Sequence, residues 1–81
     1  MTRKEANVFL AAILEIAAET PGGAPSGPMY AAMMGKLSLD DYQGLVQIAK
    51  ECDLVTEEHH VVSITSKGRE MVAKIKAARA A

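Results

Sequence analysis

The sequence contains a single cysteine, no tryptophan and few aromatic side chains. One cysteine cannot form a disulfide within the chain, so cross-linking does not stabilise these 81 residues, and a reducing compartment is the simplest setting. Cys52 falls at an apolar position of an expected helix. Because free cysteine behaves as a small apolar residue, this position predicts a buried, inert thiol, with a redox sensor as the alternative.

The sequence also lacks a long hydrophobic run. Its most apolar stretch, residues 6–18, is interrupted by Asn7 and Glu15, which makes it too short and too polar to cross a bilayer. Basic residues precede this stretch, but no convincing cleavage site follows, so we predict no signal peptide. We therefore expect a cytoplasmic protein without a membrane partner.

A strong excess of positive charge is missing as well, since the formal net charge is −1. This is not the composition of a strongly basic nucleic-acid binder. The charges are nevertheless unevenly distributed. Residues 40–58 carry six carboxylates against Lys50 alone, whereas residues 67–79 carry five basic side chains against Glu70. The middle of the chain is thus acidic, and the basic residues lie towards its two ends.

Residue patterns that indicate catalysis are absent from the sequence. The only two histidines are adjacent, no nucleophile has an evident base, and no phosphate-binding loop follows Gly22 and Gly23. Metal binding by His59 and His60 is disfavoured, because neighbouring residues of a strand point to opposite faces, and a solvated turn is the simpler interpretation. We predict a protein that is not an enzyme and that needs no cofactor or metal.

The first helix is expected from Arg3 to Glu19, because Thr2 and Glu5 form the pattern of a capping box. This helix is apolar almost all round, whereas a surface helix usually shows one apolar stripe. We therefore expect it to be buried on more than one side, by a second copy of the chain. A central core helix covered by the domain itself is the alternative. The expected homodimer interface comprises Val8, Phe9, Ala12, Ile13, Ile16, Met71 and Ile75.

Further elements follow from turn and cap residues. Residues 21–27 form a loop with a very short strand at Ala24, Ser26 caps a helix over 27–34, and Ser38 caps another over 39–52. Asp53 is expected in a left-handed conformation. Strands are expected at 54–56 and 61–65, around a polar tip at 57–60. A last helix begins at Thr65 or Ser66, with its apolar residues facing inward: Met71, Val72, Ile75 and Ala78.

Two stretches of the sequence carry a resemblance to a known family. Leu45 and Val46, followed by Ala49 and then Asp53-Leu54-Val55, are similar to the end of the recognition helix and the start of the wing in MarR-like and PadR-like bacterial regulators. The sequence of residues 64–71, Ile-Thr-Ser-Lys-Gly-Arg-Glu-Met, is similar to the segment that leaves their second wing strand. The resemblance spans about residues 8–75. It implies a mainly α (α+β) winged helix-turn-helix fold with a three-helix core, a short two-stranded wing and a C-terminal helix, as one domain over 1–81.

This resemblance also implies sequence-specific binding of double-stranded DNA by a dimer that regulates transcription. In such a domain the outward positions of the third helix would meet bases: Gln43, Gly44 and Gln47. Lys36, Ser38 and Lys50 would meet the DNA backbone. His59 and His60 would approach the minor groove from the wing tip, where protonation at mildly acidic pH would strengthen binding.

A protein-interaction module without DNA binding is the alternative function. Asp53 replaces a customary glycine at no great cost, but the wing tip is Glu-Glu-His-His where DNA-binding relatives usually place arginine or lysine. An exposed Ile48 within an acidic rim would suit a basic partner protein. Methionines are adaptable at such surfaces, although the spacing of Met29 and Met33 is more typical of core. Imitation of DNA by the acidic middle is a further alternative.

Overall fold

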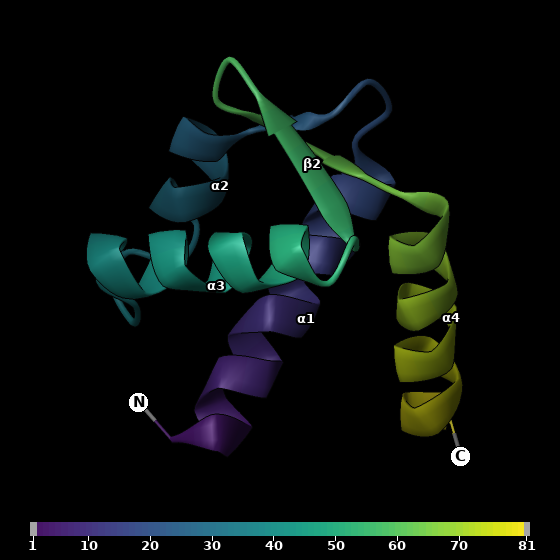
Figure 1. Ribbon diagram of the computed structural model, residues 1–81. Helices are drawn as coiled ribbons and strands as arrows, with labels where there is room; N and C mark the ends of the chain where they lie inside the picture. Colours follow the sequence, from purple (N-terminus) through teal and green to yellow (C-terminus); the bar gives the residue numbers. More distant parts are fainter. Residues whose placement is uncertain (1, 81) are drawn as a thin grey trace.

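The computed structural model describes residues 2–80. The elements follow in the order α1 (Arg3–Glu19), β1 (Ala24–Pro25), α2 (Ser26–Ala31), α3 (Leu39–Glu51), β2 (Val55–Glu58), β3 (Val61–Ile64) and α4 (Ser66–Ala80). The fold is mainly helical, of the α+β type, with one small antiparallel sheet (Figure 1). The described residues contain no helix that is both long and apolar enough to cross a membrane.

The sheet has three strands in the order β1-β3-β2, made of the expected two-stranded hairpin and the short strand expected at Ala24. Ala24 pairs with Val62 and Val55 pairs with Ile64. The third strand can pair because Gly23, at φ 102°, lies so close to β3 that any Cβ there would clash with Val61 and Ser63. The predicted short strand at Ala24 is confirmed, and it forms the edge of the sheet next to β3.

Helix α1 occupies the centre of the fold. Its predicted capping box is confirmed, because the Thr2 hydroxyl accepts from the Glu5 amide at 3.1 Å and Glu5 reaches back to the Thr2 amide at 3.3 Å. Ile13, Leu14 and Ala17 are fully buried, and the helix packs against α3, α4 and β3. The C-terminal half of α1 is therefore a core helix covered by the domain itself, which was the alternative to burial by a second copy.

Helix α2 is shorter than expected and begins differently. Pro25 is its N-cap and makes no side-chain hydrogen bond, so the expected cap by Ser26 is wrong. The chain then continues in turns, in which Met33 and Leu37 are buried while Met34 is 64% exposed. Met29 and Met33 belong to the core, as their spacing predicted.

Helix α3 begins as predicted, because the Ser38 hydroxyl accepts from the Asp41 amide at 3.1 Å. Its end differs from the prediction at Cys52, which is exposed. Cys52 caps the helix, and Asp53 then takes a left-handed conformation at φ 60°, as expected. This turn directs Leu54 into the core in place of Cys52. The prediction of a buried thiol is therefore wrong.

The β2–β3 hairpin has a tip of only two residues, since Glu57 and Glu58 belong to β2. His59 and His60 form this tip, both with positive φ, at 51° and 62°. Helix α4 follows directly, with its Gly68 amide donating to the Thr65 hydroxyl at 3.0 Å.

Only part of α4 packs against the rest of the chain. Val72 is buried and Ile75 is half-buried, but Met71 is 38% exposed and Ala78 is exposed. The expected inward orientation of Ala78 is therefore wrong, whereas Met71 faces a hollow beside α1 without being fully covered. Figure 1 shows the reason, because α1 and α4 diverge from the sheet towards the two ends of the chain.

Candidate nucleic-acid interface

The outer face of α3 carries the residues that the sequence nominated as base readers. Gln43, Gly44 and Gln47 are all exposed, while Leu45 and Val46 between Gly44 and Gln47 are buried. Open space surrounds Gly44, since a Cβ added there would meet no atom within 4 Å. The Gln47 side chain donates from Nε2 to Glu51 Oε1 at 3.2 Å. A ligand can therefore approach the backbone of α3 closely at Gly44.

Three of the nominated residues surround one shallow hollow between α3 and the hairpin. Gln43, Gln47 and His60 line it together with Tyr42 and Glu57, and its volume is about 250 Å³. A neighbouring hollow of about 410 Å³ continues towards the start of α2 at Ser26 and Gly27. The structure thus brings the polar residues of α3 and the hairpin tip to one surface.

Glu57 lies at the centre of this surface and was not singled out from the sequence. Its carboxylate accepts from the Ser26 hydroxyl at 3.3 Å and lies 3.5 Å from the Lys50 ammonium. The alternation of side chains along a strand could have indicated its position, because Glu57 lies on the same face of β2 as the buried Val55 two residues earlier. Lys50 is consequently paired within the protein and is less available to a phosphate than the sequence suggested.

The buried Tyr42 connects α3 to α2 beneath the hollow. Its hydroxyl donates to the Met29 sulfur at 3.4 Å, and its ring lies 5.4 Å from the Tyr30 ring, centroid to centroid. Burial raises the pKa of Tyr42 above its ordinary value, and the nearby charge of Glu57 raises it further. The phenol therefore stays protonated at neutral pH, and its hydroxyl keeps donating to the Met29 sulfur beneath the hollow.

The remaining nominated residues lie around the edges of this surface. Lys36 is exposed in the turn before α3, and Ser38 uses its hydroxyl oxygen to cap that helix. His59 is exposed at the hairpin tip beside His60. No group of three side chains suited to a metal ion occurs among residues 2–80.

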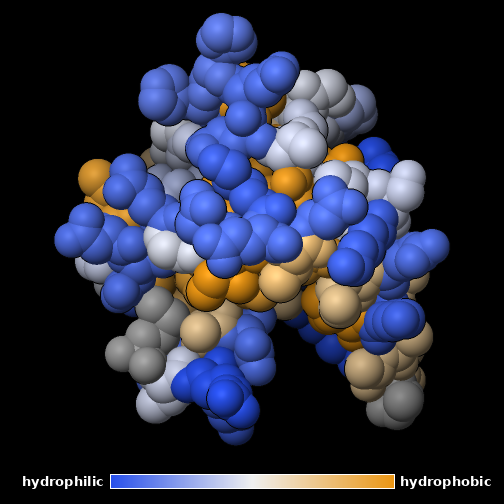
Figure 2. Space-filling view, viewed as in Figure 1, coloured by the Kyte–Doolittle hydropathy of each residue, from blue (hydrophilic) through white to orange (hydrophobic). Residues whose placement is uncertain are grey.

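Charge is unequally divided between this surface and α4. The segment from Lys36 to Glu58 carries six carboxylates and two lysines, whereas α4 carries five basic residues and one carboxylate. Hydrophilic side chains cover the front of α3 and the hairpin above it (Figure 2). Among the described residues, only Lys50 and Arg79 form ion pairs, with Glu57 and Glu15 respectively.

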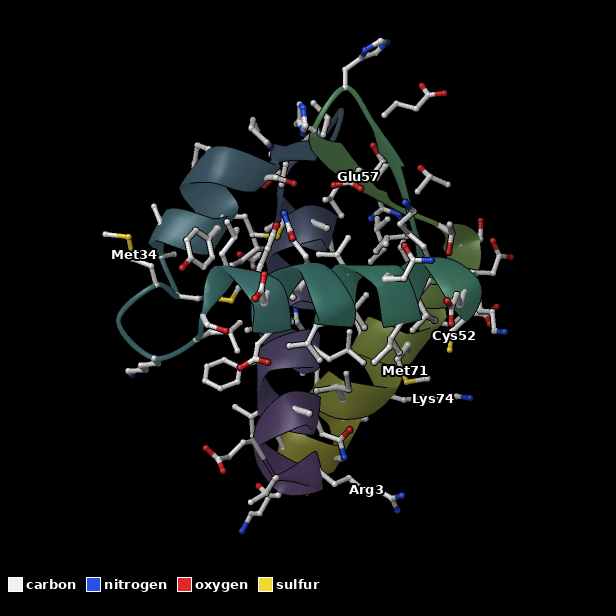
Figure 3. The ribbon with its side chains drawn as sticks, turned by 60° about the vertical axis from the view of Figure 1, so that its left-hand side comes forward. Arg3, Met34, Cys52, Glu57, Met71 and Lys74 are labelled. Carbon is white, nitrogen blue, oxygen red and sulfur yellow. The ribbon has the colours of Figure 1, made fainter. Side chains whose placement is uncertain are left out.

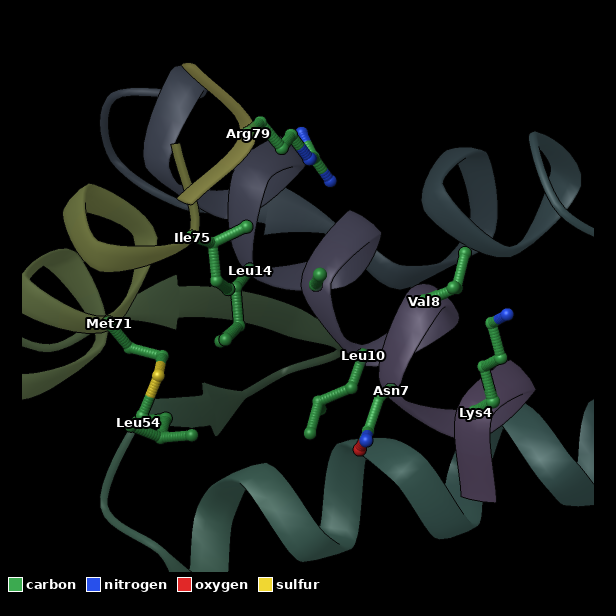
Figure 4. Close-up of a pocket in the computed structure, with 10 residues that line it drawn as sticks. Lys4, Asn7, Val8, Leu10, Leu14, Leu54, Met71, Ile75 and Arg79 are labelled. Atoms are coloured by element: carbon green, nitrogen blue, oxygen red, sulfur yellow. The ribbon is translucent and has the colours of Figure 1, made fainter. Parts of the chain in front are cut away.

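A separate hollow, between α1 and α4, has a volume of about 500 Å³ (Figure 4). Apolar side chains form most of its wall, including Val8, Met71 and Ile75 of the expected dimer interface. Phe9, Ala12 and Ile16 of that interface are half-buried against the core. Ile13 is completely buried within its own chain and cannot meet a second copy, because the fold already surrounds that side of α1.

Comparison of this chain with protein-family models, curated proteins and solved structures gave no match.

Proposed function

We propose that this chain is a winged helix-turn-helix domain that binds double-stranded DNA in transcriptional regulation. In this interpretation α2 and α3 are the helix pair, α3 enters the major groove, and the β2–β3 hairpin is the wing. The observation that carries the proposal is the hollow where Gln43, Gln47 and His60 meet on the open face of α3.

The chemistry of this face suits base recognition. A glutamine amide can donate to and accept from the edge of adenine in the major groove. Gly44 lies between the two glutamines and lets the backbone approach the bases. Gln47 would exchange its bond to Glu51 for one to a base, so the two side chains hold each other in place until DNA arrives.

The backbone of the hairpin tip supports a role for its side chains. A left-handed conformation costs a residue other than glycine about 1–2 kcal/mol, and both His59 and His60 adopt it. Asparagine and glycine would form this two-residue turn more easily. Histidine side chains held in this strained turn would contact DNA from the wing tip.

Acidic residues around α3 make a single domain a weak binder, because phosphate neutralisation supplies most non-specific affinity. We therefore propose a homodimer that occupies two half-sites. The apolar hollow between α1 and α4, with Val8, Met71 and Ile75, is the surface available for this contact.

Fluorescence anisotropy with labelled duplexes, titrated from low to physiological salt, tests the proposal. We expect binding that weakens steeply with salt. On the preferred duplex, Gln43→Ala and Gln47→Ala should each cost about 1–3 kcal/mol of discrimination between bases. Glu19→Gln, at an exposed position at the end of α1, serves as the control. No binding to any duplex at low salt would refute DNA binding.

Protein binding without DNA is the second candidate, and a specific observation favours it. Ile48 is 47% exposed on α3, near the carboxylate of Glu51 one turn later. An apolar patch with an acidic rim suits a basic protein segment. Absence of DNA binding, together with saturable binding of a basic amphipathic peptide that Ile48→Asp abolishes, would establish this candidate instead.

A further inference from the structure

DNA held on α3 would find few free cations near that helix. Lys50 is paired with Glu57 at 3.5 Å, and Lys36 lies at the opposite end of the helix, before Ser38. Positively charged contacts to phosphate must therefore come from another element if the proposed function is correct.

Helix α4 carries such cations in two pairs. Successive residues of a helix are rotated by about 100°, so residues seven apart lie on nearly the same side. Lys67 and Lys74 form one pair, and Arg69 and Lys76 form the other. All four are exposed, and none of them forms an ion pair within the part of the chain that the structure describes.

The two pairs lie on opposite flanks of α4. Met71 is four residues after Lys67 and three before Lys74, and it lines the hollow that Leu54, just after α3, also lines. Arg69 instead lines a hollow with Thr20 and Gly22, beyond the end of α1. The Lys67 and Lys74 pair is therefore on the flank nearer to α3. Figure 3 labels Cys52, Met71 and Lys74 along this edge of the molecule.

The start of α4 is also fixed to the end of α3. The Thr65 hydroxyl lies 2.6 Å from the Asp53 carbonyl oxygen, and Gly68 packs directly on the Leu54 carbonyl. Lys67 is in this first turn of α4, and Lys74 follows about 10 Å along the helix axis. A duplex presents a phosphate about every 3.4 Å of axis on each strand, so both ammonium groups can reach one backbone.

We infer that the flank of α4 with Lys67 and Lys74 contacts the phosphate backbone of DNA held on α3, while Arg69 and Lys76 on the other flank do not. This inference rests on the proposed DNA binding. It assigns affinity to α4 and base selection to α3, which separates the two tasks between two helices.

The test compares two double variants of equal charge, Lys67→Gln with Lys74→Gln, and Arg69→Gln with Lys76→Gln. The salt dependence of binding to a duplex is measured by anisotropy for both and for the wild type. Each lost phosphate contact lowers the slope of log K against log salt by about 0.9. We therefore expect the first variant to lose about 1.8 of slope per bound protomer, or about 3.6 for a dimer on two half-sites, on every duplex sequence, and the second to lose much less.

The possible outcomes separate the two proposals. Equal losses from both variants would overturn the inference, since they would indicate a general effect of net charge. An unchanged slope in the first variant would also overturn it and leave DNA binding intact. Absence of wild-type binding at low salt would refute both. Circular dichroism verifies folding, which exposed substitutions should preserve. Should the first variant instead lose binding only to vesicles containing phosphatidylserine, the cations would serve a membrane surface and the inference would be wrong.

Discussion

The two long helices of this protein, α1 and α4, are held by the fold in different ways. Helix α1 buries four residues and packs against α3, α4 and the sheet. Helix α4 is nearly as long but buries only Gly68 and Val72, both in its first half. A domain of this size has room to surround one helix. The apolar α1 takes the centre, and the basic α4 is anchored by its first two turns.

A small domain can thus hold a surface helix by only part of its length. Beyond Val72, only Ile75 of α4 is even partly buried. Alanine is frequent in this segment, and alanine has the highest intrinsic helix propensity. The second half of α4 can therefore remain helical while its charged side chains face solvent.

Loss of a buried side chain from α1 should destabilise the fold the most. Ile13→Ala should lower the free energy of unfolding by about 4 kcal/mol, because it leaves a cavity at a position with no exposed surface. Ile75→Ala, on the half-buried part of α4, should cost about 1 kcal/mol. Urea denaturation measures both. Equal losses of unfolding free energy in the two variants would contradict this account, because they would show that α4 is packed as tightly as α1.

A substitution in the first turn of α4, where the helix packs on Leu54, should destabilise the fold by a smaller amount. In Gly68→Ala the new methyl group would clash with the Leu54 carbonyl oxygen and lie 2.7 Å from Ile64 Cγ1. Overpacking of this kind costs about 2–3 kcal/mol. Gly44→Ala on α3 is the matched control, since it meets no atom and should stabilise the helix by about 1 kcal/mol. A thermal melt that placed both variants on the same side of wild type would contradict this account.

The smallest effect concerns the one ion pair that joins the two helices, between Arg79 and Glu15 at 2.6 Å. The Arg79 side chain is 58% exposed, so solvent and salt screen the pair. Arg79→Ala should therefore cost about 0.5 kcal/mol or less, and the difference should vanish in 1 M salt (roughly a 3 Å Debye length). Denaturation at low and high salt provides the measurement. A loss that persists at high salt would mean that α4 depends on packing at this end.

Local signals in the sequence predicted much of this fold. The roles of Thr2, Ser38 and Asp53 at helix ends depend only on residues a few positions away in the sequence. All three have the expected roles. Features that depend on distant segments were predicted less well. Cys52 and Met71 are apolar residues at suitable helical spacing, but whether a neighbour covers them depends on the turn at Asp53 and on the angle between α1 and α4.

The candidate site shows the same division. Exposure of Gln43 and Gln47 followed from the spacing of the buried residues of α3. The position of Glu57 between Lys50 and Ser26 did not follow from the sequence, because it depends on how the hairpin lies against α3. β1 was predicted, but its pairing with β3 depends on the close approach of Gly23.

Thr65 joins the end of α3 to the start of α4, through its contacts with the carbonyl groups of Asp53 and Leu54 and with the Gly68 amide. These bonds lie at one end of α4, and the ion pair between Arg79 and Glu15 attaches its other end to α1. The two attachments are about 20 Å apart along the helix axis. A rotation of α3 would therefore reach α1 through α4 as well as through their direct packing.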